Sequence, residues 1–157
     1  MRVLLPLLLI LALAGCYQGD GPVLAEGAQG PVKDGVWRRA DGGEVELAWD
    51  GSTGGYRVGA GGVVRLAKAG ELWLADYQAE RDIVLLAKLT PEQVVLVQPK
   101  PEAEQRLLAT HKLALKAGPI RLLSGSAAER RSYLAAAATL PESDLVEVGR
   151  LTWMAAR

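Results

Sequence analysis

The sequence has very little of the chemistry that thiols, imidazoles and phenyl rings supply. Its 157 residues include one cysteine, one histidine and no phenylalanine. A single cysteine, Cys16, excludes a disulfide within the chain. With His111 as the only histidine, the chain lacks the set of about four ligands that the usual zinc sites need. We therefore expect neither a metal nor a cofactor.

The chain also lacks an excess of charge of either sign. Lysine and arginine total 18, and aspartate and glutamate total 18, so no overall field attracts nucleic acid or an acidic substrate. The basic pairs Arg38-Arg39 and Arg130-Arg131 are isolated and lie near acidic residues. This pattern predicts solvated faces and no nucleic-acid partner.

The N-terminus carries the one long apolar run. Met1-Arg2 is a basic start, residues 3–14 are apolar and include Pro6, and the run stops before Cys16. A helix that crosses the hydrocarbon needs about 20 residues, so the run is too short for a permanent span. It is typical of a secretory signal peptide over residues 1–15.

The four residues Leu13-Ala14-Gly15-Cys16 resemble the lipobox of bacterial prolipoproteins at every position. The resemblance implies that the Cys16 thiol receives a diacylglyceryl group and that a signal peptidase recognises Leu13, Ala14 and Gly15 and cuts before Cys16. It also implies a bilayer as partner through the acyl chains. Tyr17, in place of aspartate, implies the outer membrane facing the periplasm.

The residues after Cys16 are rich in glycine and proline and have no periodicity. They predict a flexible linker over residues 16–34. From residue 35 the pattern changes, and residues 35–157 are long enough for one globular domain. The expected organisation is therefore a signal peptide, a linker and a single domain.

Strands are expected through the first half of that domain. In "EVELAWD", Val45, Leu47 and Trp49 alternate with polar residues, which is typical of a half-buried strand. Glycine-containing turns, such as "DGG" at residues 41–43, separate this strand from its neighbours. The runs "IVLLA" and "VVLV" at residues 83–87 and 94–97 are continuously apolar, which predicts strands covered on both faces.

Two helices are expected in the second half. Residues 101–116 begin with proline, carry Glu102 and Glu104 in the first turn and end before Gly118, with an apolar stripe that includes Leu107 and His111. Ser126 and Glu129 form a capping-box pattern for a second helix that continues to about residue 139.

The last residues, "DLVEVGRLTWMA", favour a strand with a bulge at Gly149, with a helix as the alternative. Together these elements predict an α+β domain: a mostly antiparallel sheet of short strands with one or two packed helices.

No catalytic set emerges from the sequence. His111 lies on the apolar stripe of a helix, which favours a position at the edge of the core over acid–base chemistry. Ser126 is explained as a helix cap, and "SGS" lacks the flanking glycines of a nucleophile elbow. We therefore expect a protein that is not an enzyme.

The tripeptide Gly35-Val36-Trp37 resembles the G-x-W opening of the lipocalins. In that family an eight-stranded barrel takes up small apolar ligands, and this is what the resemblance implies here. The four tryptophans, in a chain otherwise poor in aromatic residues, fit such a site.

Three functions follow as hypotheses. The first is an envelope lipoprotein whose domain serves as an interaction or scaffold module for an envelope protein partner. The second is a module that binds a lipid or other apolar ligand, with a pocket lined by Trp37, Trp73 and Leu107. The third, a hydrolase that uses His111, has the least support.

Overall fold

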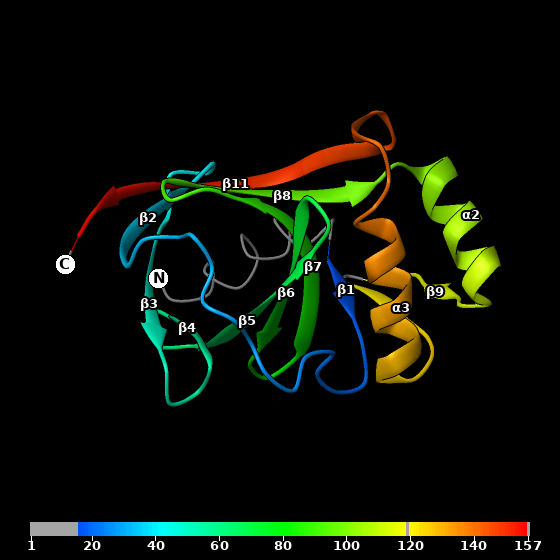
Figure 1. Ribbon diagram of the computed structural model, residues 1–157, viewed down its shortest axis with the longest axis horizontal. Helices are drawn as coiled ribbons and strands as arrows, with labels where there is room; N and C mark the ends of the chain where they lie inside the picture. Colours follow the sequence, from blue (N-terminus) through cyan, green and yellow to red (C-terminus); the bar gives the residue numbers. More distant parts are fainter. Residues whose placement is uncertain (1–15, 119, 157) are drawn as a thin grey trace.

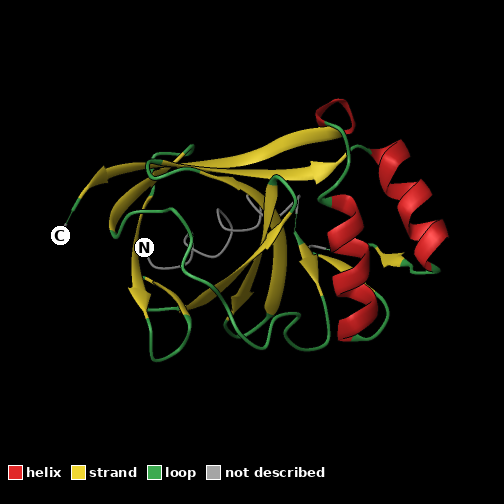
Figure 2. Cartoon of the chain, viewed as in Figure 1, coloured by secondary structure: helices red, strands yellow, loops and turns green. Residues whose placement is uncertain are grey.

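The computed structural model describes residues 16–118 and 120–156. The expected signal peptide and the lipobox residues Leu13, Ala14 and Gly15 lie outside the described residues. The described chain contains mostly antiparallel strands with two short α-helices, as the sequence predicted. The strands form a barrel, and the helices stand beside it at one end of the long axis of the molecule (Figures 1 and 2).

Eight strands follow one another around the barrel. They are β2 (Gly35–Arg39), β3 (Glu44–Asp50), β4 (Gly55–Val58), β5 (Gly62–Ala69), β6 (Leu72–Gln78), β7 (Asp82–Leu89), β8 (Gln93–Pro99) and β11 (Leu145–Ala155). Each strand pairs antiparallel with the next, and β11 pairs with β2, which closes the barrel. Strands β2 to β8 thus form a meander, and β11 completes the ring between β8 and β2.

The connection from β8 to β11 carries the remaining elements outside the ring. They are α2 (Pro101–His111), β9 (Leu115–Lys116), β10 (Arg121–Leu123), α3 (Ala127–Ala137) and the 3₁₀ turn η1 (Glu142–Asp144). The capping box of α3 is present as expected, because Ser126 Oγ accepts a hydrogen bond from Glu129 N. The helix expected over residues 101–116 ends at His111, because Lys112 adopts a left-handed conformation with φ of 54°. The following residues form β9 instead.

The C-terminal segment is a strand, and the alternative of a helix is wrong. The register between β11 and β8 shifts between Glu147 and Gly149, which confirms the bulge. A bulge lets a long strand bend and twist around a barrel. Strand β11 uses this to pair with β8 along one edge and with β2 along the other.

Alternation along the strands divides the apolar residues between two clusters. The inner cluster takes at least one residue from every barrel strand: Trp37, Leu47, Tyr56, Leu66, Ala75, Ala87, Val94 and Leu151. The outer cluster joins Leu72, Leu74, Val84, Leu86 and Val97 of β6, β7 and β8 to Tyr133 and Leu134 of α3. The two continuously apolar runs belong to β7 and β8, which are covered on both faces as predicted.

The residues expected to form a flexible linker are packed against the barrel, and that expectation is wrong. Tyr17 and Gln18 form strand β1, which pairs antiparallel with β7 and parallel with β10. We call residues 19–34 the strap. Its Leu24 and Val32 side chains are buried, and its Ala28 N donates a hydrogen bond to Leu66 O at 2.8 Å.

Buried polar contacts hold the strap in place. One carboxylate oxygen of Asp76, a residue only 1% exposed, accepts hydrogen bonds from Val23 N at 2.9 Å and Leu24 N at 2.8 Å. Arg130, also 1% exposed, donates from Nη2 to the carbonyl oxygens of Asp20 and Gly21. The strap forms no regular secondary structure that would pair its backbone groups. Asp76 and Arg130 supply hydrogen-bond partners for the backbone groups that it buries.

We expect Asp76→Ala to lower the free energy of unfolding by about 2–4 kcal/mol, because two buried N–H groups lose their acceptor. Urea denaturation would measure the change. The control is Asp41→Ala, which removes an exposed carboxylate that accepts from Gly43 N and should cost less than about 1 kcal/mol. Equal losses in the two variants would contradict the role given to Asp76.

The same region predicts a pH dependence. Burial raises the pKa of Asp82, and so does the nearby Asp76 carboxylate. The charge of Arg130 lowers it by less, so the pKa of Asp82 is raised overall. A carboxyl group with a raised pKa favours folding while it is protonated, and this contribution is lost as the pH rises through the pKa of the folded state. We therefore expect Asp82→Asn to be more stable than the wild type above about pH 4, the usual range for aspartate. Thermal unfolding between pH 3 and pH 7 would measure the difference, and one that shrinks with rising pH would contradict the sign.

Candidate functional site

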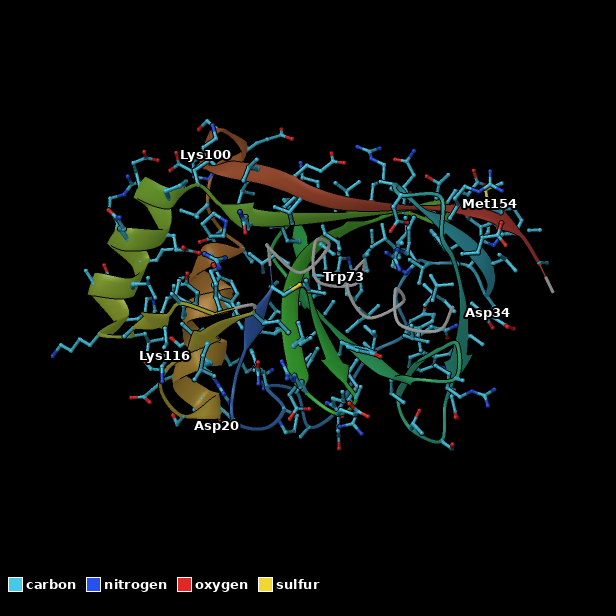
Figure 3. All side chains as sticks on the ribbon, turned by 180° about the vertical axis from the view of Figure 1, so that it is seen from behind. Asp20, Asp34, Trp73, Lys100, Lys116 and Met154 are labelled. Atoms are coloured by element: carbon cyan, nitrogen blue, oxygen red, sulfur yellow. The ribbon has the colours of Figure 1, made fainter. Side chains whose placement is uncertain are left out.

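The inner face of the barrel is the candidate site. All four tryptophans, which are Trp37, Trp49, Trp73 and Trp153, belong to the inner cluster or pack against it. Alternation places them there, since each occupies an inward position of its strand. Figure 3 shows Trp73 in the middle of the barrel, whereas Asp34 and Met154 lie at the end away from the helices.

The strap crosses the inner cluster beside β2 and anchors three of these tryptophans. Trp37 Nε1 donates to Lys33 O at 3.1 Å, and Trp153 Nε1 donates to Asp34 O at 3.2 Å. Trp49 N donates to the Asp34 carboxylate at 2.9 Å. These polar atoms are therefore satisfied by the strap, and the ring surfaces remain apolar contacts for the inner cluster.

The G-x-W tripeptide has a physical explanation at this position. Gly35 has a φ of 136°, and a Cβ there would lie 2.2 Å from Ala155 O on the neighbouring strand. Only glycine permits this approach between β2 and β11. Trp37, two residues later, is fully buried in the inner cluster. The eight-stranded barrel that the lipocalin resemblance implied is present.

The inner face is apolar yet only partly covered. Ten of its residues stay half-buried although they point inward: Val45, Trp49, Val58, Val64, Trp73, Leu85, Leu89, Leu96, Leu151 and Trp153. A close-packed interior would leave such side chains with almost no exposed surface. The inner face therefore keeps exposed apolar surface, and apolar surface is what the sites of small apolar ligands mostly consist of.

The structure brings together two of the three residues expected to line a pocket. Trp37 and Trp73 both face inward. Leu107 lies on α2 and packs against the outer cluster, so it is not part of the inner face. The spacing of apolar residues in the sequence correctly indicated an apolar stripe on the helix. Only the tertiary structure decides against which cluster that stripe packs.

The residues considered for catalysis make structural contacts. The His111 ring lies edge-on to Tyr133, with centroids 6.0 Å apart. Ser124 Oγ accepts from Ala114 N, and Ser126 Oγ caps α3. Within residues 16–118 and 120–156, no three His, Cys, Asp or Glu side chains gather as a metal site requires.

A buried polar cluster, missed by the sequence analysis, joins β1 to the helical side. The hydroxyl of Tyr17 donates to Glu104 Oε2 at 2.5 Å and lies 3.1 Å from the hydroxyl of Tyr133. Arg121 Nη1 donates to Glu104 Oε1 at 2.6 Å, and its guanidinium lies 4.9 Å from the centre of the Tyr17 ring. Burial raises the pKa of Tyr17, and burial raises the pKa of Tyr133 to about 12. Both phenols therefore stay protonated and act as hydrogen-bonding groups.

Cys16 directly precedes β1 and is 2% exposed. Burial, opposed by the charge of Arg121, raises the pKa of its thiol to about 12. In this folded arrangement the thiol is therefore a poor nucleophile, because the thiolate is the reactive form.

A shallow groove lies on the outer surface of β2 and β11. Its volume is about 310 Å³, and it is lined by Arg38, Arg39, Ala40, Arg150, Thr152 and Met154. Each arginine pairs with a carboxylate, namely Glu44, Asp41 and Glu147. The groove therefore combines balanced charge with the exposed side chain of Met154.

No helix among the described residues is long and apolar enough to cross a membrane. Comparison of the chain with protein-family models, with curated proteins and with solved structures found no match.

Proposed function

We propose that this protein is a bacterial envelope lipoprotein, anchored through acylated Cys16, whose barrel binds a small apolar molecule of the fatty-acyl class between its walls. The observation that carries the binding role is the inner face, to which all eight strands contribute apolar side chains and which is only partly covered. We propose no catalysis, because His111, Ser124 and Ser126 are accounted for by structural contacts.

The anchor rests on the lipobox resemblance of residues 13–16. In the modification that the resemblance implies, a thioether forms between Cys16 Sγ and a glyceryl carbon of a membrane phospholipid. The bond from that carbon to the phosphate head group breaks, and the thiol proton leaves with the head group. Each methylene that enters a bilayer contributes about 0.8 kcal/mol, so two or more acyl chains hold a protein stably. With Tyr17 after the cysteine, we place the protein at the outer membrane, facing the periplasm.

A role as an interaction module is the second candidate. The groove on β2 and β11 supports it, because arginines and an exposed methionine are side chains that recur at protein interfaces. Its partner would be another envelope protein. We rank this function below ligand binding, since the three arginines already pair with carboxylates of this chain.

The anchor is tested by Cys16→Ser in cells fed a clickable fatty acid. We expect the label to disappear and the precursor to remain uncut, because no other thiol exists to receive the lipid. A second variant adds Ser52→Cys, in an exposed turn, to Cys16→Ser. This double variant should stay unlabelled, since only a cysteine at the last position of the lipobox is acylated. Undiminished label on Cys16→Ser would contradict the anchor.

Ligand binding is tested on the mature chain with serine at position 16, exported behind a conventional signal peptide. The probe is parinaric acid, a fluorescent fatty acid that accepts excitation energy from tryptophan. We expect saturable energy transfer, because all four tryptophans face inward. Absence of transfer, together with a ligand-free mass in native mass spectrometry, would contradict the binding role.

Two neighbouring valines on β5 offer a matched pair for this test. Val64 faces the inner cluster and Val63 faces outward, and both are half-buried. Val64→Phe should weaken binding at least about tenfold, equivalent to about 1.4 kcal/mol, by filling ligand space. Val63→Phe should leave the affinity within about twofold, a change of about 0.4 kcal/mol. Equal effects would assign the loss to general disturbance of β5.

A further inference from the structure

The attachment point of the lipid lies at a fork in the barrel wall. Strand β7 pairs with β8 only from Leu86 to Leu89. Along Ile83 and Val84, that edge of β7 pairs with β1 instead. Residue 16 therefore lies where the wall passes from β8 to β1, beside the boundary between the inside and the outside of the barrel.

The register of β1 directs Cys16 towards the inner side. Tyr17 is opposite Val84, and both belong to the outer cluster. Successive side chains of a strand point to opposite faces. Continued by one residue beyond β1, the register brings residue 16 opposite Leu85, so we infer that Cys16 points to the same face as Leu85. Leu85 packs against the inner cluster and is half-buried.

The apolar surface nearest this position is continuous with the candidate site. Leu85 is opposite Ala75 on β6, and the next inward pair is Trp73 with Ala87. Leu96 of β8 is opposite Ala87 on the other side. An acyl chain that enters from residue 16 would thus meet Leu85, then Trp73 and Leu96, all of them partly exposed.

Strand β1 is held firmly, so residue 16 is not the end of a loose tether. The hydroxyl of Tyr17 is bound to Glu104 and lies against that of Tyr133, while Arg121 covers its ring. β1 also pairs with β10 on its other edge. Detachment of β1 would remove the hydrogen bond of Tyr17 to the buried Glu104 carboxylate, which costs free energy.

We propose that one acyl chain attached to Cys16 folds back between the barrel walls, so that the protein's own lipid is the resident ligand of the inner face. The inference rests on the proposed function, because it requires both acylation of Cys16 and an inner face that takes an acyl chain. The remaining acyl chains hold the protein at the bilayer, with the fork between β7 and β8 facing the membrane. A free apolar ligand then binds only in competition with the tethered chain.

The test uses the native lipoprotein in intact cells. Cells receive a palmitate analogue that carries a diazirine and an alkyne, and irradiation is followed by purification through the alkyne and mass mapping of cross-linked peptides. We expect cross-links within the chain, between the Cys16 lipid and peptides that contain Trp73, Leu85 or Leu96. Val64→Phe should lower their yield several-fold, and Val63→Phe should not.

The outcomes separate this inference from the proposed function. A labelled chain whose lipid cross-links only to other molecules, or to outer positions, would overturn the inference and leave the anchor intact. A chain without label would overturn the anchor, and the inference with it. Binding of parinaric acid supplies the other distinction. Equal affinity for the acylated and the unacylated mature protein would mean that no acyl chain occupies the interior, which overturns the inference alone. Failure of the unacylated protein to bind parinaric acid would overturn the binding role as well.

Discussion

Pairing of β2 with β11 is the constraint on which both cores depend. It joins a strand near the start of the described chain to its last strand, with Trp37 opposite Trp153. An open meander would leave the inward side chains of every strand in water, at a cost of about 25 cal/mol per Å² of apolar surface. Closure removes much of that cost and also removes both free edges of the meander, which are sites of aggregation in open sheets.

Closure of the barrel does not bury the apolar side chains on its outer face. The second apolar face lies mainly on β6, β7 and β8, and this is the face that α3, the residues next to Cys16 and the strap cover. The polar groups under this cover are specific: Asp76 and Arg130 hold the strap, and Glu104 with Arg121 holds β1. The two ends of the described chain are thus integrated into one body, and the proposed lipid attachment site belongs to the barrel wall.

The strands and helices were largely predictable because their signals are local. Period-two alternation identified β3, the capping box identified α3, and Gly149 marked the bulge in β11. The strap was not predictable, because its order depends on Asp76 and Arg130, which lie more than fifty and one hundred residues away. Glycine and proline gave it the composition of a linker, whereas its packing comes from long-range hydrogen bonds.

The candidate site, too, was predictable only in part from the sequence. By itself, the sequence determined that the chain has no surplus charge, one thiol at the end of a lipobox-like motif, and four tryptophans but no phenylalanine. Only the tertiary structure decided that all four tryptophans face one interior while Leu107 faces another core. The physical reason is that alternation specifies two faces of a strand but not which becomes the inside. That choice is made when β11 meets β2 and the sheet curls around one face.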